Sequence, residues 1–123
     1  MARNDAVNWF EIPCTQLSRA AAFYERMTGL ALKRERFMDV PHAIFKTEGV
    51  GGALVEDPRN APGPNGQRVF LNAGRELDAW LARVEAAGGR VLVPRTDIGP
   101  PGHIAIIQDT EGNHVGLHEP RAS

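Results

Sequence analysis

The feature of this sequence that most constrains its fold is an internal repeat. Residues 47–56 read TEGVGGALVE, and residues 110–119 read TEGNHVGLHE. Five residues (Thr, Glu, Gly, Leu and Glu) recur at the same spacing, 63 positions apart. A period close to half the chain length is typical of a duplicated supersecondary unit, so the sequence predicts two copies of one unit. The last matched pair, Glu56 and Glu119, is expected to make structural hydrogen bonds or to mark an interface.

The hydrophobic pattern predicts one strand, one helix and three further strands in each half. In the first half these elements are expected at residues 7–13, 15–29, 30–36, 43–46 and 50–56. In the second half they are expected at residues 68–73, 76–87, 90–94, 103–108 and 114–119. Thr15 or Ser18 is expected to cap the first helix and Gly29 to close it. Each unit thus has the expected order βαβββ. An offset of 60 residues aligns the two helices, which supports the duplication.

Composition limits the class of protein. The chain has 123 residues, of which 42% are hydrophobic, with a formal net charge of −1 and one cysteine, Cys14. This predicts a single domain over 1–123, with units at about 6–57 and 67–119 and a turn-rich linker at 58–66. No basic face for nucleic acid and no apolar run for a membrane is present, which excludes both as expected partners. Without a signal peptide, the cytoplasm is the expected compartment.

Several local motifs resemble one known family. They are WFEIP at 9–13, AFYE at 22–25, AWLARVEAAGG at 79–89, VLVP at 91–94 and QDTEGN at 108–113. With the βαβββ order, they resemble the vicinal oxygen chelate superfamily of glyoxalase I, bleomycin-resistance proteins and extradiol dioxygenases, and its glyoxalase-like branch in particular. The resemblance implies an α+β fold in which two βαβββ repeats form a curved mixed sheet around a cavity, with helices outside. It also implies a homodimer.

The resemblance further implies where a metal would be held. Metal-dependent members take one ligand from the first strand and one from the last strand of each unit. The helix alignment places the two first-strand positions at Trp9 and Val69, and the repeat places the two last-strand positions at Ala53 and Gly116. None carries the His, Glu or Gln side chain that suits a divalent first-row metal. We therefore expect these positions to contact a ligand without a metal cofactor, and a divalent metal is the less favoured alternative.

Strand alternation identifies further residues of the first strand. Phe10 and Ile12 are expected in the core, which leaves Trp9 and Glu11 facing the cavity. Trp9 is a candidate aromatic wall for a flat ligand, or a core or interface tryptophan. Glu11 is a candidate general base or binder of a cationic ligand, or a carboxylate paired with an arginine for structure.

The last strand adds the histidines. Val115 is expected to pack on the helices, which places His114 and His118 on the cavity face. His114 is a candidate general acid or base, or a hydrogen-bonded strand histidine. His118, near the strand end, and His103, after a Pro-Pro-Gly loop, are candidate ligand contacts or surface residues.

Three functions remain open at this point. The first is a small-molecule binding protein of the sequestering or resistance kind, without metal. The second is a divalent-metal-dependent lyase, isomerase or dioxygenase. The third is a metal-free enzyme in which Glu11 or His114 is the acid or base. The fold alone does not decide between them, because related folds host many functions.

Overall fold

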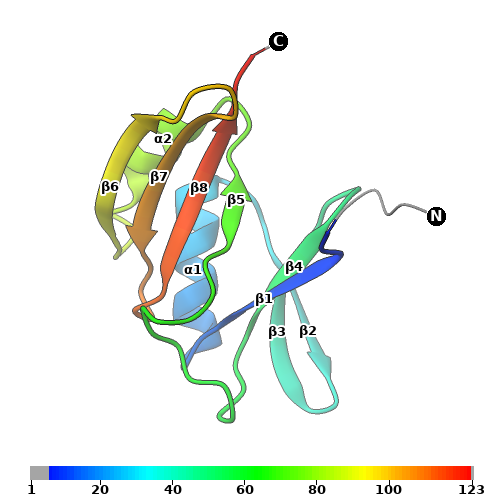
Figure 1. The fold of residues 1–123 in the computed structure, drawn as a ribbon. Coiled ribbons are helices and arrows are strands. Elements are labelled where there is room, and N and C mark those ends of the chain that lie inside the picture. The colour runs from blue at the N-terminus through cyan, green and yellow to red at the C-terminus, as the bar shows by residue number, and fades with distance from the viewer. Residues whose placement is uncertain (1–5, 123) are drawn as a thin grey trace, which may run out of the picture.

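The computed structural model describes residues 6–122. Its elements follow the order βαβββ twice (Figure 1). The first unit contains β1 (Trp9–Pro13), α1 (Leu17–Thr28), β2 (Lys33–Phe37), β3 (Val40–Phe45) and β4 (Gly51–Val55). The second contains β5 (Phe70–Asn72), α2 (Leu77–Arg83), β6 (Arg90–Asp97), β7 (Gly102–Gln108) and β8 (His114–Pro120). The predicted α+β class and the predicted repeat are confirmed.

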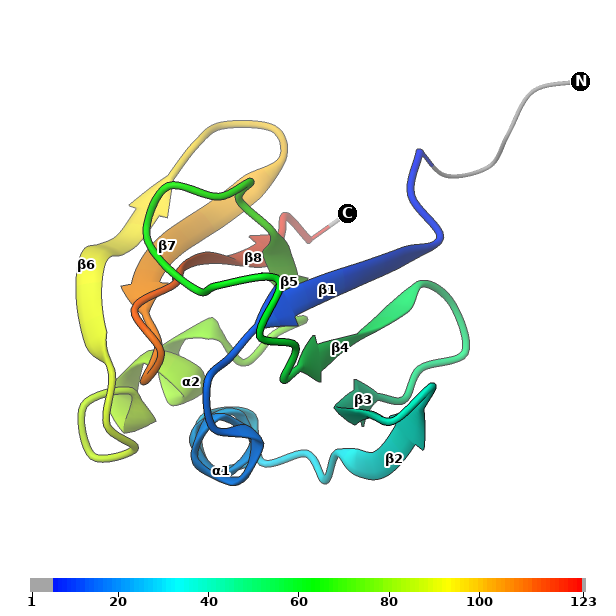
Figure 2. The same cartoon turned by 90° about the horizontal axis from the view of Figure 1, so that it is seen from below.

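The strands form two four-stranded mixed sheets. Their orders are β1-β4-β3-β2 and β5-β8-β7-β6. In each sheet the first and last strands of the unit pair in parallel, and the other pairs are antiparallel. The predicted curved surface is therefore made of two separate sheets, with β1 and β5 as edge strands. The segment that joins β4 to β5 crosses from one sheet to the other (Figure 2).

The helices and the inner faces of the sheets share one core. The apolar stripe of α1 buries Phe23, Tyr24 and Met27. This helix packs on β3, β4 and α2, and α2 packs on β6 and β8. Helix α2 ends at Arg83 rather than at the predicted Ala87, because residues 84–88 continue in turns. Neither helix of residues 6–122 combines the length and apolar character that crossing a membrane requires.

The strand register corrects one expected equivalence. Ile12 pairs with Leu54, and Leu71 pairs with Leu117, while the repeat matches Leu54 with Leu117. Ile12 therefore corresponds to Leu71, an offset of 59 for the first strands, although the helices are offset by 60. A one-residue change in register moves a strand residue to the opposite face. Arg68 is accordingly the residue of the second unit that is equivalent to Trp9. The expectation that Val69 is equivalent to Trp9 is wrong.

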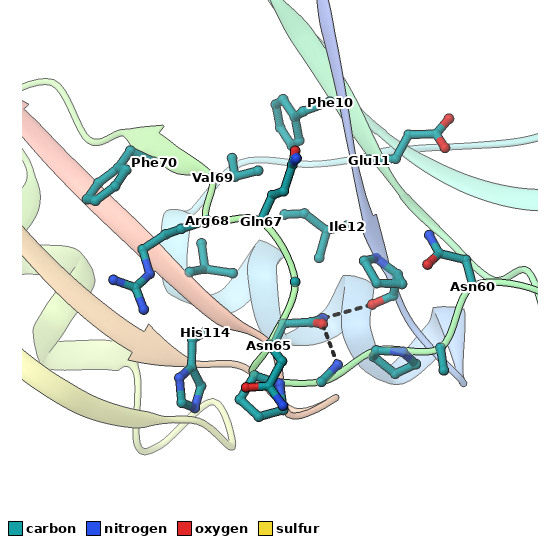
Figure 3. A pocket seen from close by; sticks show the side chains of 18 of the residues that line it. Phe10, Glu11, Ile12, Asn60, Asn65, Gln67, Arg68, Val69, Phe70 and His114 are labelled. Carbon is teal, nitrogen blue, oxygen red and sulfur yellow. Dashed lines mark hydrogen bonds between the residues drawn. The ribbon is translucent and has the colours of Figure 1, made fainter.

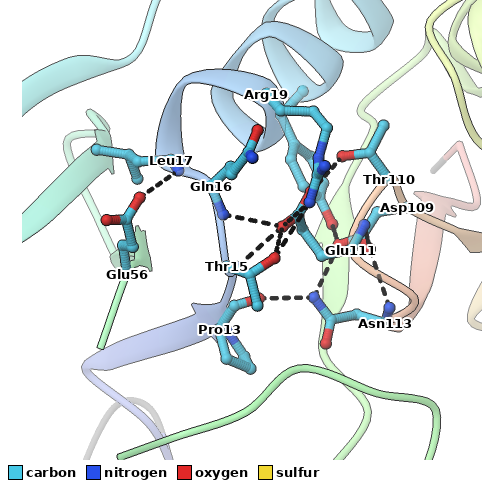
Figure 4. Close-up of polar contacts among 11 residues, drawn as sticks. Pro13, Thr15, Gln16, Leu17, Arg19, Glu56, Asp109, Thr110, Glu111 and Asn113 are labelled. Atoms are coloured by element: carbon cyan, nitrogen blue, oxygen red, sulfur yellow. Dashed lines mark hydrogen bonds and ion pairs between the residues drawn. The ribbon is translucent and has the colours of Figure 1, made fainter. Parts of the chain in front are cut away.

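Helix α1 is capped from a distance, not by its own side chains as expected. Gln16 is the N-cap residue and makes no side-chain capping bond. Instead, the backbone N–H groups of Thr15 and Gln16 donate to Oε1 of Glu111, at 2.9 and 3.2 Å (Figure 4). The N–H of Leu17 donates to Oε1 of Glu56 at 2.7 Å. These carboxylates satisfy N–H groups that have no partner within the helix.

The last residue of the repeat has the same role in both units. As Glu56 accepts from the first residue of α1, Glu119 accepts from the N–H of Leu77, the first residue of α2, at 3.3 Å. The expected structural hydrogen bonds of Glu56 and Glu119 are confirmed. The repeated segment is thus a strand that ends in a carboxylate cap for the helix of its own unit.

The turn at Asp109–Asn113 joins the two units. Tyr24 Oη on α1 donates to Oδ2 of Asp109 at 2.7 Å in the core, and Asn113 Nδ2 donates to the carbonyl of Pro13 at 2.8 Å. Burial, together with the neighbouring Asp109 carboxylate, raises the pKa of Tyr24 well above its usual value, so the hydroxyl remains a donor. Glu111, in the same turn, also forms an ion pair of 2.7 Å with Arg19.

Replacing Glu111 with Gln should remove a pH-dependent part of the stability. Burial alone would raise the pKa of Glu111, but hydrogen bonds from Arg19, Thr15 and Gln16 outweigh burial and lower it from 4.5 to about 2. The stabilisation is therefore complete above about pH 4.5 and is lost as the pH falls towards 2. We expect Glu111→Gln to lower the free energy of unfolding by on the order of 3 kcal/mol at neutral pH. The difference from wild type should shrink on acidification, as measured by denaturant unfolding at several pH values.

Glu48→Gln provides the matched control. Glu48 is the counterpart of Glu111 in the first unit, but it is exposed and makes no hydrogen bond within residues 6–122. Its replacement should leave the free energy of unfolding within about 0.5 kcal/mol of wild type. A difference between wild type and Glu111→Gln that stayed constant from pH 7 to pH 3 would contradict the assigned role of the carboxylate.

Substitution of two strand glycines, Gly52 and Gly116, should lower the stability of the fold by different amounts. A Cβ at Gly52 would meet the backbone oxygen as well as the ring of Phe10, which lies in the core layer. A Cβ at Gly116 would meet only the ring of Phe70, which is 48% exposed and can move outwards. We expect Gly52→Ala to destabilise the fold by about 1–3 kcal/mol and Gly116→Ala by less. Thermal unfolding of the two variants measures this, and equal losses would contradict the difference in packing.

Candidate ligand-binding cleft

An open cleft of about 1020 Å³ lies between β1 and the segment that leads into β5. Figure 3 shows it with Phe10, Ile12 and Val69 among the apolar side chains around it. Its other lining residues are Val7, Trp9, Glu11, Pro13, Val50, residues 60–68, Phe70, Asn113, His114 and Val115. The cleft therefore takes its lining from both units and from the linker between them.

The β1 wall carries an aromatic ring and a carboxylate. Trp9 is 42% exposed, and its Nε1–H donates to Oε2 of Glu11 at 3.3 Å. The same Glu11 oxygen lies 3.9 Å from Nε2 of the buried His42. Nδ1 of His42 is 2.8 Å from the carbonyl of Val40, which can only accept, so Nδ1 carries a hydrogen. The Nε2 atom of His42 is thereby left to face Glu11.

The opposite wall is formed by Arg68, Phe70 and His114. The exposed Phe70 ring lies against Gly116 of β8, at the place that a side chain of residue 116 would occupy. Nε2 of the half-buried His114 is 3.3 Å from Oε1 of Gln108. In Figure 3 the Arg68 side chain extends towards His114, and Asn65 lies on the same side of the cleft. This wall is apolar at Phe70 and cationic at Arg68.

Of the eight residues predicted to form the site, the structure brings four into one cleft. Trp9, Glu11, Val69 and His114 line it. Ala53 is fully buried, and Gly116 lies under the Phe70 ring. The other two make contacts elsewhere: His118 Nε2 lies 2.9 Å from the carbonyl of Pro101, and His103 lies 3.8 Å from Asp97.

The sequence-based interpretation missed Arg68 and Phe70. It aligned the first strands by the offset of the helices, which placed Val69 rather than Arg68 opposite Trp9. The core residues that pair across strands give the correct alignment. The repeat matches Leu54 with Leu117, and their apolar partners in the adjacent first strands are Ile12 and Leu71. Alignment on Ile12 and Leu71 would have found both residues.

The residues present do not fit the divalent metal that the fold family implies. With the corrected register, the four positions are Trp9, Ala53, Arg68 and Gly116. Two have no donor atom in their side chain, and tryptophan and arginine side chains have no lone pair to offer a metal. The Phe70 ring also fills the space beside Gly116. Within residues 6–122, no three His, Cys, Asp or Glu side chains are grouped so that they could hold a metal ion.

Cys14 is not arranged as a nucleophile. It is 2% exposed, and burial, with Glu111 and Glu56 nearby, raises the pKa of its thiol to about 12. The thiolate, which is the reactive form, is therefore strongly disfavoured. The smaller pocket of about 410 Å³, which Cys14 lines with Thr15, residues 56–58 and residues 60–62, therefore has no activated thiol.

Curated proteins of similar sequence carry glyoxylase names. The chain is 29% identical over 122 residues to a protein of Mycobacterium tuberculosis named "Putative glyoxylase CFP32". It is 29% identical over 126 residues to a "Glyoxylase-like domain-containing protein" of Didymella fabae, covering 92% of each chain. The alignment with CFP32 covers 94% of this chain but only 46% of that protein, so the chain spans about half of its length.

Solved structures show the same architecture. A glyoxalase/bleomycin resistance protein from Albidiferax ferrireducens T118 superposes with a TM-score of 0.74 at 17% identity, covering 94% of this chain and 99% of that one. TnmS3, an antibiotic binding protein from Streptomyces sp. CB03234, superposes with a TM-score of 0.70 at 25% identity, covering 98% and 100%.

The family model described as "Glyoxalase/Bleomycin resistance protein/Dioxygenase superfamily" matches residues 6–117, which include both βαβββ units. The chain therefore belongs to the glyoxalase/bleomycin resistance protein/dioxygenase superfamily.

Proposed function

We propose that this protein binds a small organic molecule with a flat apolar part in the cleft, without a metal. The observation that carries the proposal is the pair of exposed aromatic side chains, Trp9 and Phe70, that come from different units and line the same cleft. Exposed aromatic rings in a concave site offer a large apolar surface to a ligand. Trp9 is at one of the four implied metal positions, and the Phe70 ring fills the space beside another, Gly116.

The size and lining of the cleft support this proposal. Pockets for drug-sized ligands typically measure 300–1,000 Å³ and combine an apolar lining with a few polar groups. The cleft of about 1020 Å³ lies at the upper end of that range, and its lining is divided evenly between apolar side chains and polar groups, which include Glu11, Arg68 and His114. The likeness to TnmS3, which is named as an antibiotic binding protein, also favours binding over a particular reaction.

A metal-free enzyme is the second candidate, and one observation favours it. Glu11 Oε2 lies 3.9 Å from His42 Nε2. A proton that the Glu11 carboxylate abstracts from a bound compound can therefore pass to the imidazole. The fate of a bound compound distinguishes the candidates. A compound recovered unchanged after prolonged incubation supports binding alone, and a compound converted at a rate that Glu11→Gln abolishes supports the enzyme.

Trp9 fluorescence tests the binding proposal. We expect the neutral quencher 4-nitrobenzyl alcohol to quench wild-type fluorescence saturably, because it stacks near the exposed Trp9. Trp80 is the internal control, since it is 5% exposed and packed in the core. In Trp9→Phe, which retains Trp80, the saturable quenching should disappear. Calorimetry should show binding weakened by roughly threefold to tenfold in Trp9→Ala, from the loss of stacking.

Two results would contradict the proposal. Quenching that rises linearly with probe concentration, as for free N-acetyltryptophanamide, would show collisions without a binding site. Quenching that is equally saturable in Trp9→Phe would show that the probe binds near Trp80 and not in this cleft.

The open cleft also supports the predicted homodimer. Val7 and Val50 line the cleft and are 53% and 39% exposed, and neither is one of the two rings proposed to contact the ligand. A group of exposed apolar side chains favours coverage by another surface, and we propose that a second copy of the chain supplies it. Sedimentation equilibrium should give a mass twice the 13.4 kDa of one chain. Replacing Val50 with Lys should shift the mass towards one chain, and a wild-type mass of one chain at all concentrations would contradict the dimer.

A further inference from the structure

We propose that the ligand of this cleft is a planar aromatic acid, whose anionic group is bound by Arg68 and His114 while its ring lies against Trp9 and Phe70. This inference rests on the proposed binding function and adds the chemical class of the ligand. The structure supports it in four steps: the row of residues across the second sheet, the lack of a partner for Arg68, the orientation of His114, and the position of Glu11.

The first step is a row of polar side chains across the second sheet. Arg90 pairs with Gln108, and Gln108 pairs with His114. Phe70 pairs with Gly116 in parallel, and the Gly116 N–H donates to the Val69 carbonyl at 2.8 Å, so the same register continues back to place Arg68 beside His114. Residues directly paired across strands share one face of a sheet. Two arginines, a histidine and a glutamine thus follow one line on the open face, and Arg68 and His114 are the members that line the cleft.

The second step is that the guanidinium of Arg68 is not used by the fold. Most arginines of residues 6–122 donate to a carboxylate or a backbone carbonyl. They are Arg19, Arg34, Arg36, Arg59, Arg75, Arg83, Arg95 and Arg121. The Arg68 side chain has no hydrogen bond or ion pair within the described residues. Its five N–H groups are therefore available to a ligand, and their planar fork matches the two oxygens of a carboxylate.

The third step is that His114 is held in place next to this guanidinium. Its Nε2 atom lies 3.3 Å from Oε1 of Gln108, and in Figure 3 the Arg68 side chain extends towards the imidazole. A histidine whose Nε2 donates to an amide oxygen can receive a further proton on Nδ1, and both nitrogens are then donors. The Nδ1 atom of His114 makes no hydrogen bond with the described residues, so it is left to a ligand beside the Arg68 guanidinium.

The fourth step is that Glu11 sets the direction of the ligand. Its carboxylate is on the β1 wall, where it accepts from Trp9 and lies near His42. A ligand carboxylate placed at this wall would be repelled by a like charge, whereas the Arg68 wall attracts it. The anionic group is therefore directed to Arg68, and the ring of the ligand extends over Phe70 towards Trp9.

A matched pair of probes tests the inference. 4-Nitrobenzoate and 4-nitrobenzyl alcohol have the same ring and nearly the same size, but only the first is an anion at pH 7. We expect wild-type protein to bind the acid about tenfold more tightly than the alcohol at low salt. In Arg68→Gln the affinity for the acid should fall to within about twofold of the affinity for the alcohol, and the affinity for the alcohol should not change. The preference should also fall with added sodium chloride, because this site is open to solvent.

Arg26→Gln is the control for the loss of a positive charge. Arg26 is also exposed and without a side-chain partner in residues 6–122, but it lies in the last turn of α1 and does not line the cleft. This variant should retain the tenfold preference for the acid. Arg68→Lys, which keeps the charge but loses the fork, should show an intermediate preference. Because neither Arg68 nor Arg26 makes a side-chain hydrogen bond or ion pair within residues 6–122, all three variants should unfold within a few degrees of the wild-type temperature.

The outcomes separate this inference from the proposed function. Failure of wild-type protein to bind either probe would overturn the proposed function and the inference together. Equal affinity of wild type for the two probes would overturn the anion site and leave the binding function standing. A preference for the acid that survived in Arg68→Gln would likewise show that another group recognises the anion.

Discussion

The fold depends most on one buried carboxylate, that of Glu111. Its side chain is inaccessible to solvent, yet it carries a negative charge, which is costly unless hydrogen bonds and an opposite charge compensate. The two backbone N–H groups before α1, the Thr15 hydroxyl and the Arg19 guanidinium provide that compensation. Because all these donors come from the first unit and the carboxylate from the second, the N–H groups of Thr15 and Gln16 reach this acceptor only when the two units are docked.

This docking contact also positions the cleft. Glu111 belongs to the turn whose Asn113 donates to the Pro13 carbonyl and accepts from the N–H of Gly63 in the linker. One side chain therefore joins the end of β1, the linker and the start of β8, which are the three segments that surround the cleft. His114 follows Asn113 directly, so its place on the cleft wall is set by the contact that joins the units.

The sequence was sufficient to predict the order and type of every element, because hydrophobic period and repeat spacing depend on local pattern. Strand alternation predicted Trp9, Glu11 and His114, which line the cleft. Phe10, Ile12 and Val115, which alternation assigned to the core, line it as well, so alternation alone does not define the lining. The sequence did not reveal the caps of α1, because Glu111 lies 95 residues from Gln16 and no local pattern links them. It also missed Arg68, because β1 and β5 are aligned by their pairing with β4 and β8 and not by the helices.

The corrected register gives the duplication a chemical consequence. Trp9 and Arg68 occupy equivalent places in the two units, as do Glu11 and Phe70. In one unit the pair is an aromatic ring and an anion, and in the other it is a cation and an aromatic ring. Strand β1 and the segment that leads into β5 lie on either side of one cleft, so the Glu11 carboxylate and the Arg68 guanidinium are on opposite walls, each close in sequence to one of the two rings. A duplicated unit has thereby become a polarised site, in which a ligand with one charged end has only one favourable orientation.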